Sequence, residues 1–180
     1  MLVDGGAVLI DADAISRAAT AAGGAAIAQI AAQFGAQTIT PDGAMNRDAM
    51  RQRVIANPRA LLQLEAIIHP LVSVESARLA EQARLAGSVL LVFDIPLLVE
   101  SKRWRQQLGQ VLVIDCNEDT QVSRVVARSG WTPDAVDKIM AHQATRRQRL
   151  AAADIVIYNQ DLTLGELALQ VAQIARRLTL

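Results

Sequence analysis

The chain has 180 residues, 52% of them hydrophobic, so it is long enough for one substantial core and short for two independent domains. Its 18 basic and 18 acidic residues cancel, which argues against a nucleic-acid partner held by summed positive charge. Cys116 is the only cysteine, which excludes an intrachain disulfide and a cysteine-based zinc cluster. Apolar runs stay below the length of a membrane span and the start does not resemble a signal peptide, so we expect a cytoplasmic protein without a membrane partner.

Four short apolar runs are rich in β-branched residues and do not alternate with polar ones, which is typical of buried parallel strands. The four runs are Ala7–Ile10, Val89–Phe93, Val111–Ile114 and Ile155–Tyr158. Helical patterns separate them, and this alternation favours a parallel sheet with helices on both faces. The expected fold class is therefore α/β.

Two helical segments are predicted in the first half of the chain. Apolar residues recur at helical spacing within the Ala- and Gly-rich region 18–36, which predicts a short amphipathic helix. Asn57 followed by Pro58 predicts an N-cap and a first-turn proline, and we expect Pro70 to kink or end the helix that begins there.

Two more helices are predicted near the carboxyl end. Thr132 followed by Pro133 repeats the N-cap and proline signal, and the helix should run through about His142. The apolar spacing of Leu164–Leu178 predicts a last amphipathic helix.

Polar side chains follow each predicted strand. Asp11 and Asp13 come after the first, Asp94 after the second, Asp115 after the third and Asn159 after the fourth. Any one of these aspartates has an ordinary explanation, because Asp favours turns and helix starts. Ligands of open α/β sheets bind outside the carboxyl ends of the strands, so several carboxylates there predict a site for magnesium and for a hydroxyl that loses its proton.

Four segments in collinear order resemble the dephospho-coenzyme A kinase family. They are VLIDADAISR at Val8–Arg17, HPL at His69–Leu71, DIPLLVE at Asp94–Glu100 and QATRRQRLAAADIVIYN at Gln143–Asn159. The resemblance implies ATP-dependent phosphorylation of the ribose 3′-hydroxyl of dephospho-coenzyme A. It also implies a single P-loop kinase domain over 1–180, with a helical coenzyme A-binding insertion within 14–86 and a helical lid over 118–150.

The resemblance also implies that a segment of the family pattern is missing here. Family members begin with a strand, a GxxGxGK[ST] loop and a helix, and a Walker A loop needs its lysine next to a glycine to cradle the ATP phosphates. The only lysines of the chain are Lys102 and Lys138, and neither follows a glycine. We therefore expect the central first strand and the loop to be missing, and this chain to fold marginally and to bind ATP weakly.

The resemblance assigns the catalytic roles to two residues. Asp13 matches the aspartate that takes the proton from the ribose 3′-hydroxyl, and Arg146 matches the lid arginine that faces the transferred phosphates. A guanidinium can stabilise the negative charge that spreads during transfer. Asp11 is expected to orient water or magnesium near the substrate, or alternatively to cap the helix that follows it.

The remaining site residues belong to the two substrates. Pro96, Leu97, Leu98 and Glu100 match the segment against which the adenosine end of dephospho-coenzyme A packs, while Asp94 departs from the family pattern and suits a hydrogen-bonded turn. His69 is expected either to contact this substrate or to be structural beside a proline. On the ATP side the resemblance points to Asn159 for the adenine and to Arg147 and Arg149, beside Arg146, for the phosphates.

The ligands implied by the family are ATP, Mg²⁺ as part of the ATP complex, and dephospho-coenzyme A. No tightly bound cofactor, no protein-held metal, no nucleic acid and no obligate protein partner are expected. One alternative is a non-catalytic coenzyme A or nucleotide-binding remnant of the family. Another nucleotide kinase of the same fold is a third possibility, against which the HPL and DIPLLVE segments argue.

Overall fold

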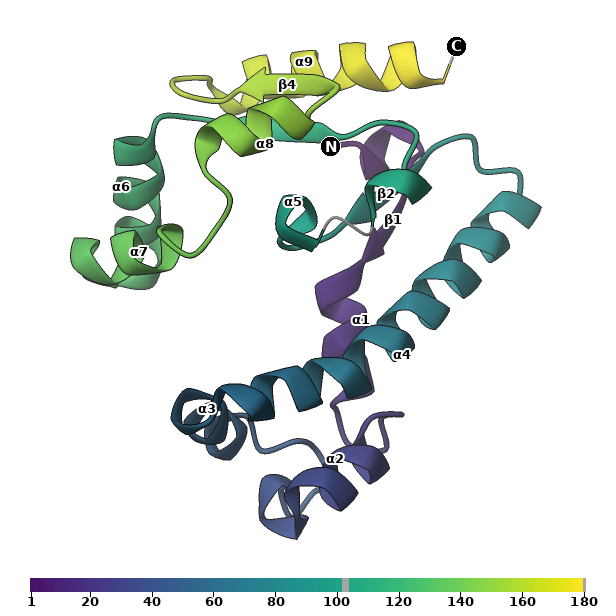
Figure 1. The fold of residues 1–180 in the computed structure, drawn as a ribbon. Helices are drawn as coiled ribbons and strands as arrows, with labels where there is room; N and C mark the ends of the chain where they lie inside the picture. Colours follow the sequence, from purple (N-terminus) through teal and green to yellow (C-terminus); the bar gives the residue numbers. More distant parts are fainter. Residues whose placement is uncertain (102–103, 180) are drawn as a thin grey trace. The chain divides into compact units, whose positions relative to one another are not determined.

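The computed structural model describes residues 1–101 and 104–179 (Figure 1). Contacts divide the chain into two compact units, of which the first is Gly6–Ile95 and the second is Met1–Gly5 together with Pro96–Leu180. Lys102, one of the two lysines weighed above, lies outside the described residues. That the whole chain acts as a single kinase domain stays a prediction.

The first unit combines a parallel strand pair with a largely helical segment. Its elements are β1 (Val8–Asp11), α1 (Ala12–Ala19), α2 (Ile27–Phe34), a 3-10 turn (Ala36–Thr38), α3 (Arg47–Ala56), α4 (Pro58–Leu85) and β2 (Leu91–Asp94). β1 and β2 pair in a register that sets Val8 against Leu91 and Asp11 against Asp94. The carboxyl ends of these two strands therefore bring two aspartates side by side, as the sequence predicts.

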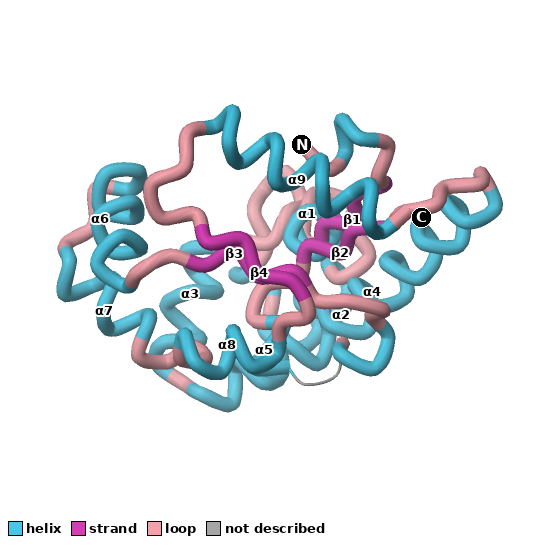
Figure 2. Tube along the Cα trace, turned by 90° about the horizontal axis from the view of Figure 1, so that it is seen from above, coloured by secondary structure: helices cyan, strands magenta, loops and turns pink. Residues whose placement is uncertain are grey.

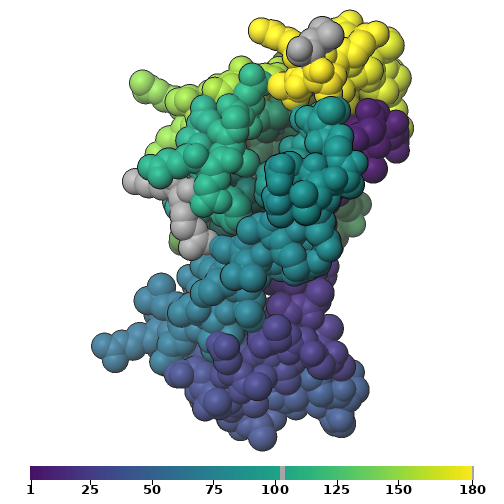
Figure 3. All heavy atoms as spheres, turned by 90° about the vertical axis from the view of Figure 1, so that its right-hand side faces the viewer, coloured from purple at the N-terminus to yellow at the C-terminus, as the bar shows by residue number. Residues whose placement is uncertain are grey.

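A helical core holds the first unit together. Ile30 and Ala26 are completely buried, and Phe34 and Met50 are 3% and 2% exposed. These side chains come from α2, the turn before it and α3, and they pack with Ala60 at the start of α4. In Figure 3 this region forms one packed body of purple and blue spheres.

The start of α4 follows the sequence prediction, whereas its length does not. Asn57 Oδ1 accepts a hydrogen bond of 3.0 Å from the Arg59 backbone N–H, and Pro58 occupies the first turn. Of the two outcomes expected at Pro70, a kink or an end of the helix, the end does not occur, because α4 continues through it to Leu85. A proline removes one backbone hydrogen bond, but α4 packs against α1 here, since Ile68 and Val72 of α4 share a hydrophobic cluster with Ile15 of α1. Figure 1 shows α4 as one ribbon that changes direction part-way along.

The second unit contains the other strand pair and the remaining helices. Its elements are a 3-10 turn (Val3–Gly5), α5 (Leu98–Ser101), a 3-10 turn (Arg105–Gln107), β3 (Leu112–Asp115), α6 (Glu118–Ser129), α7 (Pro133–Met140), α8 (Arg146–Ala152), β4 (Ile155–Tyr158) and α9 (Leu164–Leu178). β3 and β4 lie side by side in Figure 2 and pair in parallel, with Asp115 opposite Tyr158. Thr132 caps α7 as expected, and α7 ends at Met140, close to the expected end at about His142.

The strands bury one face, where the sequence predicts burial on both. Ile10 and Ile157 are each 1% exposed, but their neighbours Leu9 and Val156 are 46% and 45% exposed. Among the described residues β2 pairs only with β1 and β3 only with β4. Each sheet therefore has two strands, and a two-stranded sheet is covered less completely than the larger sheet that the apolar runs suggest.

The α/β fold class is confirmed by the parallel strand pairs and the helices that join them. Region 14–86 is mostly helical, and region 118–150 contains α6, α7 and most of α8. The roles of these regions as coenzyme A-binding insertion and lid stay predictions. No helix within the described residues is both long enough and apolar enough to cross a membrane.

Candidate active site

The carboxyl end of β1 holds two aspartates in different surroundings. Asp11 caps α1, since its Oδ1 accepts a hydrogen bond of 2.8 Å from the Ala14 backbone N–H, and its Oδ2 lies 3.6 Å from Arg17 Nη2. Asp13 is exposed in the first turn of α1 and has no hydrogen bond or ion pair with another described residue. Asp11 therefore has the capping role that the sequence left as an alternative, whereas the role of Asp13 as the base stays a prediction.

A groove lies between α1 and α4 of the first unit. It has a volume of about 640 Å³ and is mostly apolar, with Glu75 as its charged lining residue. The other lining residues are Ala14, Ile15, Ala18, Ala19, Ala25, Pro70, Leu71 and Val74. Asp13 and His69 directly precede two of them in the chain, and His69 is exposed on α4 without a hydrogen bond to a described residue. The predicted base Asp13 and the predicted substrate residue His69 thus come next to residues of the groove wall.

The DIPLLVE segment divides between the two units. Pro96 and Leu97 are exposed, Leu98 is half-buried, and Leu97 has a φ of 53°, which is uncommon for a residue other than glycine. Glu100 Oε1 accepts a hydrogen bond of 2.5 Å from the Ala144 backbone N–H. This contact joins α5 to the turn before α8, so Glu100 has a structural contact in addition to its predicted contact with substrate.

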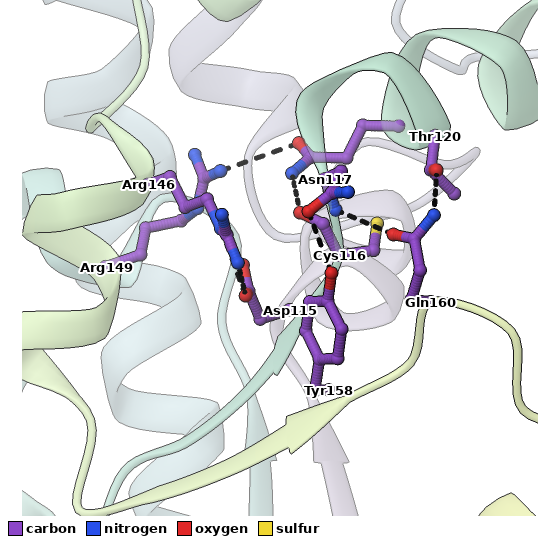
Figure 4. A network of polar contacts seen from close by, with 9 residues as sticks. Asp115, Cys116, Asn117, Thr120, Arg146, Arg149, Tyr158 and Gln160 are labelled. Atoms are coloured by element: carbon purple, nitrogen blue, oxygen red, sulfur yellow. Dashed lines mark hydrogen bonds and ion pairs between the residues drawn. The ribbon is translucent and has the colours of Figure 1, made fainter.

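A buried carboxylate meets a predicted catalytic arginine in the second unit (Figure 4). Asp115 ends β3 with its side chain 4% exposed, and Arg146 begins α8 with its side chain 36% exposed. Arg146 Nε lies 2.9 Å and 3.0 Å from the two Asp115 oxygens, and Nη2 lies 2.6 Å from Oδ2. A two-pronged contact of this kind fixes the guanidinium plane as well as its charge.

The surroundings of this pair favour its charged state. Hydrogen bonds from Arg146 lower the pKa of the Asp115 carboxyl, against the opposing effect of burial, and the charge of Arg149 lowers it further. The same hydrogen bonds raise the pKa of Arg146. The guanidinium carbon also lies 5.8 Å from the centre of the Tyr158 ring, within reach of a cation–π contact.

The three neighbouring arginines of the predicted lid, Arg146, Arg147 and Arg149, have different surroundings. Arg149 Nη1 donates a hydrogen bond of 2.6 Å to the Ala144 carbonyl, and its Nη2 lies 3.5 Å from Gln121 Oε1. Arg147 is exposed, and no hydrogen bond or ion pair joins it to another described side chain. Only Arg146 meets a buried carboxylate, which separates it from the two residues that the sequence could not distinguish from it.

The loop after β4 is held by polar contacts to α6. Arg124 donates hydrogen bonds of 2.9 Å to the carbonyls of Asn159 and Gln160. The Gln160 side chain accepts from the Asn117 backbone N–H at 2.9 Å and donates to Thr120 Oγ1 at 2.6 Å. Asn159, the predicted adenine contact, therefore sits in a fixed loop.

A cavity of about 350 Å³ lies among α6, α7 and α8. Its charged lining residues are Glu118, Asp119, Asp137, Arg146 and Arg149. Carboxylates face it from α6 and α7, whereas α8 supplies its guanidiniums. The lining therefore has more carboxylates than guanidiniums, and its positive charge is confined to α8.

Sequence reasoning missed the partners of two site residues. Asp115 was expected only as a strand-end aspartate and Arg124 was not among the expected site residues, but their contacts span 31 and 35 residues of the chain. The signal that was present is the pairing of β3 with β4, which brings Asp115 opposite Tyr158 and near the residues that lead into β4. No local pattern indicates which of the three lid arginines reaches Asp115.

We expect Asp115→Asn to lower the free energy of unfolding by about 2 kcal/mol at pH 7, the size of a lost charged hydrogen-bond pair, reduced because Arg146 is partly solvated. The pKa of Asp115 is lowered by folding, so its contribution is fully present above the unfolded value of about 3.9 and is lost as the pH falls through the folded value. Urea unfolding of both proteins at a series of pH values measures the difference. If the difference in the free energy of unfolding between the unsubstituted protein and Asp115→Asn stays constant below pH 4, the ion pair is contradicted.

Comparison with known proteins identifies close relatives along most of the chain. Residues 1–164 match the family described as dephospho-CoA kinase. The chain is 53% identical over 176 residues to the dephospho-CoA kinase of Albidiferax ferrireducens, and the matched region covers 98% of this chain and 83% of the relative. It is 49% identical over 163 residues to the dephospho-CoA kinase of Bordetella pertussis, covering 91% and 75% of the two chains.

Solved structures share the fold. A crystal structure of a Thermus thermophilus protein superimposes with a TM-score of 0.77 at 27% identity, over 98% of this chain and 86% of that chain. Dephospho-CoA kinase from Campylobacter jejuni gives a TM-score of 0.71 at 19% identity, over 98% and 87%. The second likeness concerns the fold alone.

Proposed function

Because the chain belongs to the dephospho-CoA kinase family, we propose that it transfers the γ-phosphoryl group of ATP to the ribose 3′-hydroxyl of dephospho-coenzyme A. The observation that carries this proposal is the family match over residues 1–164. The exposed Asp13 at the end of β1 supports it, because the reaction needs a group that orients a hydroxyl and takes its proton.

Asp13 is the base in this proposal. The 3′-oxygen attacks the γ-phosphorus, the bond between that phosphorus and the β-bridging oxygen breaks, and ADP leaves. The hydroxyl proton passes to the Asp13 carboxylate. Phosphoryl transfer depends mainly on positioning and charge stabilisation, so a carboxylate held by the first turn of α1 is adequate for the task.

Arg146 acts on the phosphate side. Its Nε and Nη2 are taken by Asp115, whereas Nη1 has no acceptor among the described residues. The free edge of the guanidinium can therefore donate to an ATP phosphate, where negative charge spreads during transfer. Arg147, Arg149 and Asn159 complete the ATP contacts in this proposal, and Mg²⁺ arrives with ATP as part of the substrate complex.

The groove of the first unit takes the pantetheine arm of dephospho-coenzyme A. The groove is mostly apolar and large enough for a flexible chain of that size, and its wall begins one residue after Asp13 and one after His69. In this arrangement His69 contacts the same substrate. Pro96, Leu97, Leu98, Glu100 and Asp11 keep their predicted substrate contacts.

We expect Ala18→Leu to raise the Kd for dephospho-coenzyme A about tenfold, because the larger side chain fills part of the groove that Ala18 lines. The Kd for Mg-ATP should not change. Ala77→Leu is the matched control, since Ala77 is exposed on α4 and does not line the groove. Calorimetric titration of the three proteins gives both constants, and an unaltered dephospho-coenzyme A affinity in Ala18→Leu would place the arm elsewhere.

A second candidate is a coenzyme A-binding protein without kinase activity. It is favoured by one sequence observation, which is that neither lysine follows a glycine. The two candidates separate when a strand and Walker A loop are joined ahead of Met1. Conversion of dephospho-coenzyme A to coenzyme A in that longer chain supports the kinase, whereas tight binding without conversion supports the second candidate.

A further inference from the structure

We propose that Asp115 is a positioning residue that fixes the guanidinium of Arg146 for its contact with the phosphates of ATP. The inference deepens the proposed function and rests on the role given there to Arg146. It starts from a carboxylate that is 4% exposed and would be costly to bury without a partner. Arg146 is the side chain that meets this need.

The geometry of the pair divides the guanidinium into two edges. Nε and Nη2 face Asp115 at 2.6 to 3.0 Å, so one edge is fully engaged. Nη1 has no acceptor within the described part of the chain, and Arg146 lines the cavity of about 350 Å³ among α6, α7 and α8. Because the guanidinium is planar and rigid, fixing one edge also fixes the direction of the other.

Neighbouring contacts restrict the pair further. The Tyr158 ring lies 5.8 Å from the guanidinium carbon, and its hydroxyl donates a hydrogen bond of 2.8 Å to Asn117 Oδ1 (Figure 4). The backbone at Arg146 is anchored by a capping box, in which Thr145 and Gln148 bond to each other's backbone N–H groups. Side chain and backbone of Arg146 are therefore both held before any nucleotide binds, which lowers the entropy lost on binding.

The opposite role for Asp115 would be that of a competitor. A carboxylate that holds Arg146 could instead withhold it from phosphate, so that ATP must first break the ion pair. The two roles predict opposite results when the carboxylate is removed. Loss of a positioning contact weakens ATP binding, whereas loss of a competitor strengthens it.

The test compares Asp115→Asn with the unsubstituted 180-residue chain. Mg-ATP is titrated to millimolar concentrations while the ¹⁵N-labelled side-chain Nε–H signal of Arg146 is followed by nuclear magnetic resonance. We expect a protected Arg146 signal that shifts with ATP in the unsubstituted chain. In Asp115→Asn the signal should move to the position of a solvated arginine, and the Kd for Mg-ATP should rise about tenfold, the loss expected when one charge-assisted hydrogen bond is misdirected.

Two further variants test whether the change in ATP affinity is specific to the contact of Asp115 with Arg146. Asp161→Asn removes an exposed carboxylate of the same unit that has no partner among the described residues, and it should leave both readouts unchanged. In an Arg146→Lys background, Asp115→Asn should cause little additional loss of ATP affinity, since Asp115 acts through Arg146. A merely structural role would give equal losses in both backgrounds.

Several outcomes would overturn the inference. One is unchanged or tighter ATP binding in Asp115→Asn. Another is an equal loss of ATP affinity from Asp115→Asn in the presence of Arg146 and in the Arg146→Lys background. The third is an Arg146 signal that does not shift when ATP is added to the unsubstituted chain. These outcomes differ from failure of the proposed function. A protein that binds ATP through Arg146 but makes no coenzyme A, even with a Walker A loop, would refute the kinase proposal and leave the role of Asp115 intact.

Discussion

Asp13→Asn is expected to lower kcat for dephospho-coenzyme A phosphorylation by at least about 100-fold, the usual effect of losing a general base. Asparagine keeps the size and polarity of the side chain but cannot take the proton. The KM for dephospho-coenzyme A should change little, because the carboxylate acts mainly on the reacting hydroxyl. Asp13 is exposed and unpaired among the described residues, so the substitution should also leave folding almost unchanged.

Turnover is measured by coupled detection of ADP, with a strand and Walker A loop joined ahead of Met1, since no lysine of the sequence follows a glycine. Asp11→Asn is the matched control, because asparagine caps a helix about as well as aspartate and the Ala14 contact can be kept. Asp11→Asn should lower kcat much less than Asp13→Asn does. An unchanged kcat in Asp13→Asn would remove this residue from the base role.

Arg146→Lys is expected to reduce kcat by about 100-fold or more and to weaken ATP binding much less. Lysine keeps the positive charge but cannot make the two-pronged contact with Asp115 while donating to a phosphate from its other edge. Removing one preorganised donor to a charged transition state typically costs a factor of about 100 to 1,000. Steady-state kinetics at varied ATP concentration separate the two effects.

The neighbouring arginines serve as comparisons for this result. Arg147→Lys and Arg149→Lys should each lower kcat less than Arg146→Lys does, since neither side chain contacts a buried carboxylate. Equal losses in all three would mean that the net positive charge of α8 matters and the geometry of Arg146 does not. A loss confined to Arg149→Lys would transfer the assignment to that residue.

Local signals in the sequence were sufficient to predict the four strands and some of the helices, whereas α3, α6 and α8 were not predicted from them. Ile155–Tyr158 and Leu164–Leu178 have the predicted bounds, because apolar runs and apolar spacing depend on neighbouring residues alone. The same holds for Asn57 and Thr132, whose capping side chains bond backbone N–H groups two or three residues away. Such contacts are encoded within one turn of helix.

Features that depend on packing were predicted less well. Pro70 does not end α4, because contact with α1 outweighs the local cost of one proline. Leu9 and Val156 are exposed although their strands read as buried on both faces, since burial depends on what covers the sheet.

In the candidate site too, local contacts could be predicted from the sequence and contacts that depend on packing could not. Asp13 and Asp11 could be chosen from the sequence because they follow a predicted strand, and the capping role of Asp11 is a contact over three residues. The pairing of Asp115 with Arg146 could not be predicted, since it needs the end of β3 and the start of α8 to meet across 31 residues. Arg124 shows the same limit, because its acceptors lie on the loop after β4.

Phosphorylation of the ribose 3′-hydroxyl is tested most directly by the position and amount of phosphate transferred. Dephospho-coenzyme A and Mg-ATP are incubated with the chain that carries a Walker A loop ahead of Met1, with its Asp13→Asn variant as the blank. Phosphorus nuclear magnetic resonance then identifies the new phosphate monoester, and ADP is measured in parallel. We predict a 3′-phosphate formed in a one-to-one ratio with ADP and almost none in the variant, whereas ATP hydrolysis without that product, or phosphate on another hydroxyl, would contradict the account.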